Sequence, residues 1–211
     1  MTPAQEIAAR LQQCPLVAII RGVTPDEAEA VGEAIVAAGI RIVEVPLNSP
    51  NPFESIRRLA ARLGQRALVG AGTVLDPADI ARVETAGGRL IVSPNTNPAV
   101  IAATAAAGLV ASPGYFTPSE AFAALAAGAH VLKLFPAEGA SPAVVKAQRA
   151  VLPPGVPLLV VGGITPDNMA PWRKAGATGF GLGSGLYTPG RSPDEVGARA
   201  RAYVDGLAEL R

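Results

Sequence analysis

The chain has 211 residues, of which 49% are hydrophobic and 17% are charged, and its formal net charge at pH 7 is +1. This balance, without a clustered basic face, argues against a nucleic-acid-binding protein. No apolar stretch reaches the roughly 20 residues of a membrane-spanning helix, and the N-terminus lacks a signal-peptide pattern, so we expect a cytoplasmic protein without membrane association.

The chain contains one cysteine, Cys14, and one histidine, His130. A single cysteine excludes an internal disulfide, and Cys14 precedes an apolar run in which we expect it to be buried. A zinc site built from these residue types needs three or four ligands, so we predict no metal of this kind and no zinc-dependent chemistry. A magnesium site made of carboxylates stays open at this point.

Short apolar runs alternate with alanine-rich helical patterns along the chain, after a polar segment over residues 1–13 that begins as a helix. The expected strands are Leu16–Ile20, Ile42–Pro46, Ala67–Gly70, Leu90–Ser93, Leu109–Ser112, Val131–Phe135, Pro157–Val161 and Gly179–Leu182. The expected helices are Pro25–Ala38, Pro52–Leu63, Pro77–Ala86, Pro98–Ala107, Pro118–Ala127, Pro142–Val151, Pro166–Ala175 and about Ser192–Leu210. Many helices start with a capping residue followed by proline, as at Thr24-Pro25, and end at a glycine such as Gly39.

Eight strands, each followed by a helix at a spacing of roughly 20–25 residues, predict an α/β fold with a single (β/α)8 TIM barrel over residues 1–211. The N-terminal helix is extra to this repeat. A doubly wound open sheet is the alternative, but eight units in a chain of this length favour a closed barrel. The active site of such a barrel lies at the carboxyl ends of the strands.

Lys133 lies inside the apolar run Val131–Phe135, although the chain has few lysines beside its many arginines. Burial lowers the pKa of an amine, and a neutral amine is what Schiff-base chemistry with a carbonyl compound needs. Glu44 lies in a similar run, Ile42–Pro46, and alternation places both residues in the interior of even-numbered barrel strands. We therefore expect Glu44 and Lys133 to face each other across the barrel. A structural ion pair, or a lysine that reaches water, is the alternative.

Glycine-rich segments lie at the ends of the predicted seventh and eighth strands, namely Gly162-Gly163 and Gly181-Leu182-Gly183-Ser184. Free backbone amides in such loops bind anions, and these two loops are the recurrent phosphate site of this fold. Glycine also serves tight turns, so the prediction depends on the two loops together. Arg21, after the first strand, either adds positive charge to the ligand site or is a surface residue.

Five segments that follow one another along the chain resemble the class I 2-dehydro-3-deoxy-6-phospho-sugar-acid aldolases. They are Val43-Glu44-Val45, residues 69–75, residues 132–138, Gly162-Gly163-Ile164 and Gly183-Ser184. Residues 20–22, residues 44–50 and Val161 are most similar to the phosphogalactonate branch of this family. Phosphogluconate relatives typically carry Leu-Arg-Thr at residues 47–49 and threonine in place of Val161, so a phosphogluconate or dual-specificity enzyme is the alternative.

The resemblance implies a lyase that cleaves 2-dehydro-3-deoxy-6-phosphogalactonate to pyruvate and glyceraldehyde 3-phosphate without a cofactor or metal, in a homotrimer. Lys133 would form the Schiff base, and Glu44 would act as the general acid/base. The residues implied to bind the substrate are Arg21, Thr73, Pro94, Phe135 and Val161, and those implied to bind its phosphate are Gly162, Gly163, Gly183 and Ser184.

Two other classes of function stay open on the residues alone. A sugar-phosphate isomerase or epimerase would share the phosphate loops but would leave Lys133 without a covalent role. A non-catalytic phosphate-metabolite binding protein predicts binding without turnover, and a Glu44→Gln protein that is indistinguishable from the parent.

Overall fold

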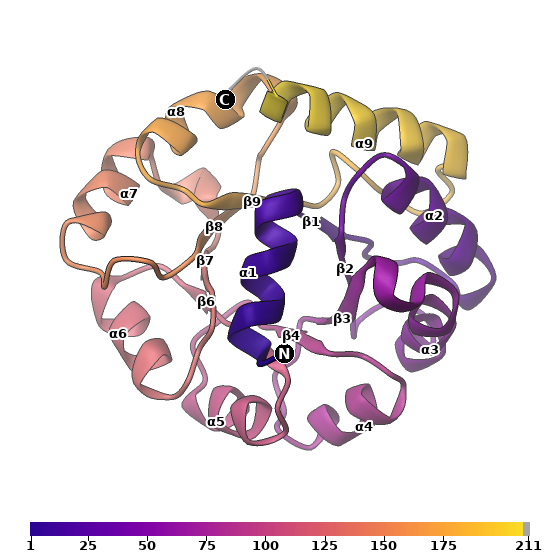
Figure 1. Cartoon of the computed structure of the whole chain (residues 1–211), viewed down its shortest axis with the longest axis horizontal. Coiled ribbons are helices and arrows are strands. Elements are labelled where there is room, and N and C mark those ends of the chain that lie inside the picture. The colour runs from indigo at the N-terminus through magenta and orange to yellow at the C-terminus, as the bar shows by residue number, and fades with distance from the viewer. Residues whose placement is uncertain (209–211) are drawn as a thin grey trace.

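In the computed structural model, which describes residues 1–208, parallel strands form a barrel surrounded by helices (Figure 1). The strands are β1 (Leu16–Ile19), β2 (Ile42–Pro46), β3 (Leu68–Gly72), β4 (Leu90–Val92), β5 (Val110–Ser112), β6 (Gly114–Tyr115), β7 (Leu132–Leu134), β8 (Leu158–Val161) and β9 (Gly179–Leu182). Their order in the sheet is β5-β4-β3-β2-β1-β9-β8-β7-β6. The predicted TIM barrel is therefore confirmed.

The barrel closes at Pro113, which follows the predicted fifth strand, observed as β5, and separates it from β6, a short strand that was not predicted. Proline has no N–H to donate to a ladder, so regular pairing is interrupted there. β5 pairs with β4, and β6 pairs with β7. The Lys133 N–H also donates to the Pro113 carbonyl at 3.0 Å, which ties β7 to the interrupted strand.

Helices α2 to α9 surround the strands as the outer ring of the barrel, whereas α1 precedes β1 and lies outside this ring (Figure 1). The helices are α1 (Pro3–Gln13), α2 (Pro25–Ala37), α3 (Pro52–Leu63), α4 (Asp79–Thr85), α5 (Pro98–Ala106), α6 (Pro118–Ala126), α7 (Pro142–Arg149), α8 (Met169–Lys174) and α9 (Pro193–Ala208), with short 3-10 helices at Gly64–Arg66, Ala137–Gly139 and Pro166–Asn168. The extra N-terminal helix is thus confirmed as α1.

Some element ends differ from the prediction. α4 starts at Asp79 and not at Pro77, because the Asp76 side chain accepts a hydrogen bond from the Ala78 N–H at 2.9 Å and forms a turn before the helix. The helix expected from Pro166 starts with a 3-10 turn, since Pro171 cannot donate the α-helical hydrogen bond to that turn. Residues 209 and 210, predicted as the end of the last helix, lie outside the described residues.

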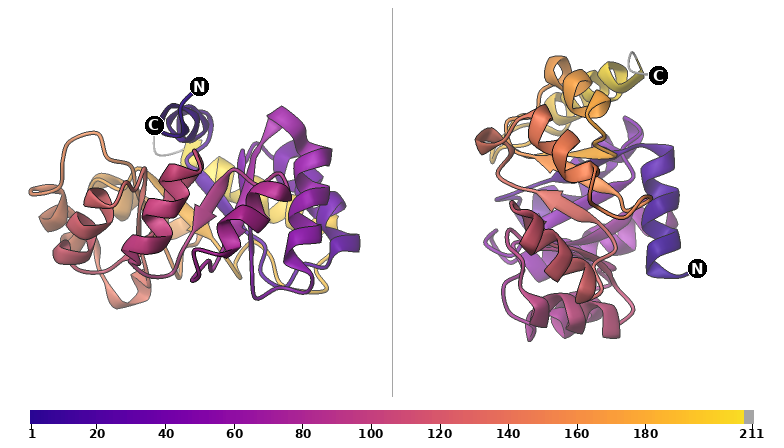
Figure 2. Two further views of the ribbon diagram at one scale, coloured as in Figure 1. Left: turned by 90° about the horizontal axis from the view of Figure 1, so that it is seen from below. Right: turned by 90° about the vertical axis from the view of Figure 1, so that its left-hand side faces the viewer.

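α1 lies across the end of the barrel at which the strands begin (Figures 1 and 2). Its apolar residues Ile7 and Leu11 belong to the interior apolar cluster, whose other members are Val17, Ile19, Ile42, Leu68, Leu90, Val92, Val110, Val131, Leu159 and Val161. Glu6 forms an ion pair with Arg89, and Arg10 donates to the Gln65 carbonyl at 2.6 Å. Because α1 covers this end, the opposite end, where the strands finish, is the mouth of the barrel. None of the helices within residues 1–208 combines the length and the apolar character needed to cross a membrane.

Candidate active site

Lys133 lies on β7 and faces the barrel interior. Val131, two residues before it, belongs to the interior apolar cluster, and Phe135, two residues after it, packs against that cluster. Because side chains alternate along a strand, Lys133 also points into the barrel interior. Lys133 is 7% exposed, and its Nζ lies 4.8 Å from the centroid of the Phe135 ring. Burial lowers the pKa of Lys133; the nearby Glu44 opposes this change and Arg21 adds to it. An amine that loses its proton more easily is suited to attack a carbonyl carbon.

Glu44 faces the same interior from β2. It is 2% exposed, and among the described residues its Oε2 atom is buried without a hydrogen-bond partner. Burial raises the pKa of Glu44 to about 7, against the opposing influence of Lys133 and Arg21. Both protonation states are then populated near neutral pH, which is the condition a general acid/base needs. The two residues line one cavity in the barrel interior, as the alternation of their strands predicts.

Gly72 on β3 provides the space for the Glu44 carboxylate, because a glycine has no side chain to fill the region beside the neighbouring strand β2. A Cβ atom on Gly72 would lie 1.8 Å from Glu44 Oε2 and 2.5 Å from Oε1. Any side chain at this position would therefore displace the carboxylate. Gly72 was not among the predicted site residues, although the sequence held a signal: an inward-facing glycine on the strand beside a buried acid.

Three polar residues form a cluster at the mouth, just beyond the ends of β1, β2 and β3. Arg21 donates to Asn48 Oδ1 and, at 3.3 Å, to Thr73 Oγ1. Thr73 has a φ of 56°, which a β-branched residue adopts at a cost of roughly 1–3 kcal/mol. Strained residues of this kind gather at ligand sites. The cluster includes two of the predicted substrate-binding residues, and Asn48, which follows β2, was not among the predicted site residues.

Val161 and Pro94, also predicted to bind the substrate, lie at different depths. Val161 is the last residue of β8 and lines the interior cavity together with Lys133 and Glu44. Pro94 follows β4 at the mouth and is partly exposed. A Cβ atom on Gly114 would lie 2.3 Å from the Pro94 carbonyl oxygen, so the chain after β4 packs tightly against β6.

The two predicted phosphate loops lie side by side, because β8 and β9 are neighbours and Val161 pairs with Gly181. Gly162 and Gly163 have φ values of 121° and 62°, which favour glycine. Within residues 1–208, none of the loop backbone hydrogen bonds uses the N–H groups of Gly162, Gly163 or Ser184 as donors. Backbone amides that donate no such bond are suited to an anion.

A carboxylate borders this pair of loops. A Cβ atom on Gly162 would lie 2.0 Å from Glu138 Oε2, so the side chain of Glu138 extends over the first glycine of the pair. Glu138 is exposed and can turn toward solvent. An anion bound at these amides would therefore meet a negative charge unless Glu138 moves aside.

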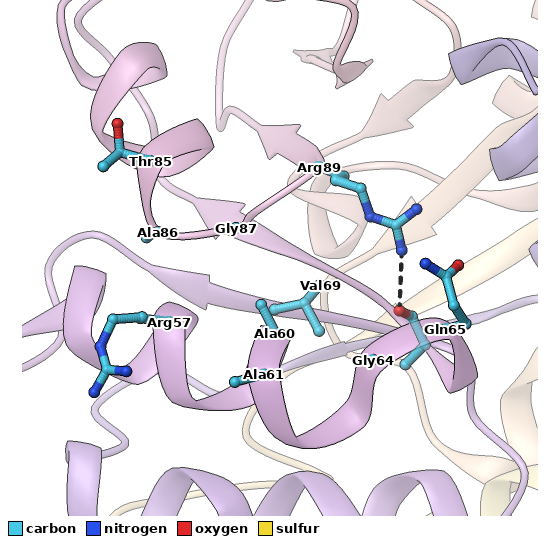
Figure 3. A pocket seen from close by; sticks show the side chains of 11 residues that line it. Arg57, Ala60, Ala61, Gly64, Gln65, Val69, Thr85, Ala86, Gly87 and Arg89 are labelled. Carbon is cyan, nitrogen blue, oxygen red and sulfur yellow. Dashed lines mark hydrogen bonds between the residues drawn. The ribbon is translucent and has the colours of Figure 1, made fainter.

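A separate hollow of about 380 Å³ lies outside the barrel between α3 and α4 (Figure 3). Of its charged residues, Arg57 forms an ion pair with Glu54, and Arg89 pairs with Glu6 and donates to the Ala67 carbonyl at 3.4 Å. None of the predicted site residues lines this hollow. The described part of the chain also brings together no group of three or more His, Cys, Asp or Glu side chains suited to a metal ion.

Comparison with known proteins relates the chain to one group. The sequence profile of the KDPG and KHG aldolase family matches residues 7–194. The chain is 49% identical over 190 residues to the probable 2-dehydro-3-deoxy-6-phosphogalactonate aldolase of Rhizobium meliloti (strain 1021), covering 90% of each protein. It is 45% identical over 195 residues to the 2-dehydro-3-deoxy-6-phosphogalactonate aldolase of Escherichia coli (strain K12), covering 92% of this chain and 95% of that protein. A solved structure described as native KDPGal matches with a TM-score of 0.92 and 44% identity, over 94% of this chain and 96% of that one.

Proposed function

Because the chain belongs to the KDPG and KHG aldolase family, we propose that it is a class I aldolase that cleaves 2-dehydro-3-deoxy-6-phosphogalactonate into pyruvate and glyceraldehyde 3-phosphate. The observation that carries this proposal is the pairing of a buried lysine and a buried glutamate, Lys133 and Glu44, around one interior cavity. A barrel that only bound a phosphorylated metabolite would not require this costly arrangement.

In the proposed reaction, the neutral amine of Lys133 attacks the C2 carbonyl carbon of the substrate, and loss of water gives a protonated imine. The imine withdraws electrons, so the C3–C4 bond breaks while the Glu44 carboxylate takes the proton of the C4 hydroxyl. This step releases glyceraldehyde 3-phosphate and leaves the enamine of pyruvate on Lys133. C3 then takes a proton, and hydrolysis of the imine releases pyruvate and the free amine.

The two ends of the substrate are held apart in this proposal. Arg21 and Thr73 bind the substrate at the mouth, and the loops after β8 and β9 bind the phosphate through their free amides. Phe135 and Pro94 line the pocket between these groups. Binding energy at the remote phosphate then orients the reacting carbons against Lys133 and Glu44.

The choice of phosphogalactonate over phosphogluconate depends on Val161. This side chain is buried in the wall of the interior cavity and has no group that can hydrogen-bond a substrate hydroxyl.

Pyruvate formation from each epimer tests the proposal, and we expect a higher kcat/KM on the phosphogalactonate. Equal efficiencies would indicate a dual-specificity enzyme. If neither epimer yields pyruvate, the proposal fails and an isomerase or a binding protein takes its place.

We also propose that the chain assembles as a homotrimer. Three large apolar side chains are more than one-third exposed in the single chain, namely Leu75, Phe116 and Phe122. Assembly of several chains would cover apolar surface of this kind. Analytical ultracentrifugation would show a particle of three times the monomer mass, whereas a monomer would contradict this proposal. The cytoplasmic location expected from the sequence stays a prediction.

A further inference from the structure

Ser112 faces the barrel interior close to the proposed catalytic pair. It is the last residue of β5, and Val110, two residues earlier, belongs to the interior apolar cluster. Its register partner on β4, Val92, belongs to the same cluster. Ser112 is 2% exposed and lines the cavity that Glu44 and Lys133 also line.

Among the described residues, Ser112 Oγ is buried without a hydrogen-bond partner, and Glu44 Oε2 shares this condition. A buried polar group without a partner costs roughly 1–3 kcal/mol. The fold satisfies the serine that follows β4, because Ser93 donates its hydroxyl to the Val74 carbonyl at 2.7 Å. Two unsatisfied oxygens around one cavity, beside a buried amine, therefore indicate a function rather than packing.

The cavity between these side chains has room for a single small ligand. The volume of the cavity is about 10 Å³, close to the minimum of roughly 10–15 Å³ that one ordered water molecule needs. A buried water takes two to four polar partners. The cavity offers three such partners, namely Glu44 Oε2, Ser112 Oγ and Lys133 Nζ. The other residues that line it are apolar or glycine.

We propose that Ser112 is a positioning residue of the active centre, and that its hydroxyl holds one water molecule against Glu44 and Lys133. This inference rests on the proposed function. Protons pass through the water between Glu44 and C3 of the pyruvate enamine. When C3 is protonated, the water gives it a proton and takes one from the Glu44 carboxyl. The carbon–carbon double-bond pair forms the new C–H bond, and the nitrogen lone pair forms the C=N bond of the imine.

Loss of the hydroxyl is expected to slow proton transfer and to leave substrate binding at the mouth intact. The water would lose one of its three partners, and general acid/base catalysis contributes about 10²- to 10⁴-fold in enzymes. We expect the Ser112→Ala protein to lose about tenfold in kcat, a small part of that contribution, with KM within about twofold of the parent.

The exchange of the pyruvate methyl protons with D2O, followed by NMR, isolates this step, and borohydride trapping of pyruvate measures imine formation separately. The Ser112→Ala protein should form the imine to the same extent as the parent and exchange about tenfold more slowly. Ser55→Ala is the matched control, because Ser55 is also buried with a hydroxyl that has no hydrogen-bond partner within residues 1–208, but it lies on α3, outside the interior cavity. It should exchange at the parental rate.

A second variant, Ser112→Cys, keeps the approximate size of the side chain and weakens its hydrogen bonding, so it should be slow as well. Parental exchange in whichever Ser112 variant folds, or an equal loss in Ser55→Ala, would overturn the role of Ser112 and leave the aldolase proposal standing. If the parent protein forms no imine with pyruvate, the proposed function fails and this inference fails with it.

Discussion

The carboxylate of Glu44 occupies the space that the missing side chain of Gly72 leaves open on the next strand. The two residues lie on β2 and β3, which are hydrogen-bonded neighbours with Pro46 opposite Gly72. A Cβ atom at Gly72 would approach Glu44 Oε2 to 1.8 Å. The position of the proposed acid/base thus depends on a residue that takes no part in the chemistry.

The Gly72→Ala substitution should therefore displace Glu44 while leaving the barrel folded. The backbone of Gly72 lies outside the left-handed region, so alanine meets the carboxylate and not a forbidden backbone conformation. We expect kcat/KM to fall by about 100-fold, because acid/base catalysis needs a close fit between the carboxylate and the substrate. Gly197→Ala on α9 is the control, since its new methyl group would approach no atom closer than 3.4 Å. A Gly72→Ala protein with parental activity would contradict this account.

The raised pKa of Glu44 predicts a particular dependence of stability on pH. The folded chain keeps the Glu44 proton up to a pKa of about 7, whereas the unfolded chain releases it near 4.5. Between these values the folded state binds more protons, so the free energy of unfolding falls as pH rises, and the loss is complete above pH 7. The Glu44→Gln protein lacks this titration.

The stability of Glu44→Gln relative to the parent should therefore increase by up to about 3 kcal/mol between pH 4.5 and pH 7.5. Urea unfolding of both proteins across this range measures the difference. A difference that stays constant with pH would show that Glu44 titrates normally, and the acid/base role would lose its physical basis.

Val161→Thr should move the substrate preference toward the phosphogluconate epimer. Threonine places a hydroxyl in the wall of the interior cavity, where valine offers only methyl groups. A site that hydrogen-bonds a substrate hydroxyl discriminates more strongly than one that lacks the partner. The measurement is the ratio of kcat/KM on the two epimers, and an unchanged ratio would remove Val161 from the explanation of specificity.

Glu138→Gln should strengthen the binding of anions at the glycine loops. Its carboxylate extends over Gly162. Removal of this negative charge should make the binding free energy of phosphate more favourable by about 1 kcal/mol at an exposed site. Inorganic phosphate as a competitive inhibitor should then bind about fivefold more tightly. Glu29→Gln, an exposed glutamate on α2, is the control and should leave the inhibition constant unchanged. Equal inhibition of the Glu138→Gln and parent proteins would place the phosphate elsewhere.

Local patterns in the sequence were sufficient to predict the barrel and the inward direction of its functional side chains. Alternation placed Glu44 and Lys133 in the interior, and proline-marked caps located most helix starts. The contacts of Gly72 and Ser112 depend on how neighbouring strands are staggered, which no local pattern encodes. The bond from Arg21 to Asn48 joins two loops that are distant in the chain, so it too appears only in three dimensions.

The most direct test of the central claim, that Lys133 forms a covalent imine, is borohydride trapping with pyruvate followed by peptide mapping. The account predicts that the label lies on Lys133, that Lys133→Met abolishes labelling, and that Lys146→Met, which changes an exposed lysine on α7, labels like the parent. Label that persists in Lys133→Met, or that maps to Lys146 or Lys174 in the parent protein, would contradict it.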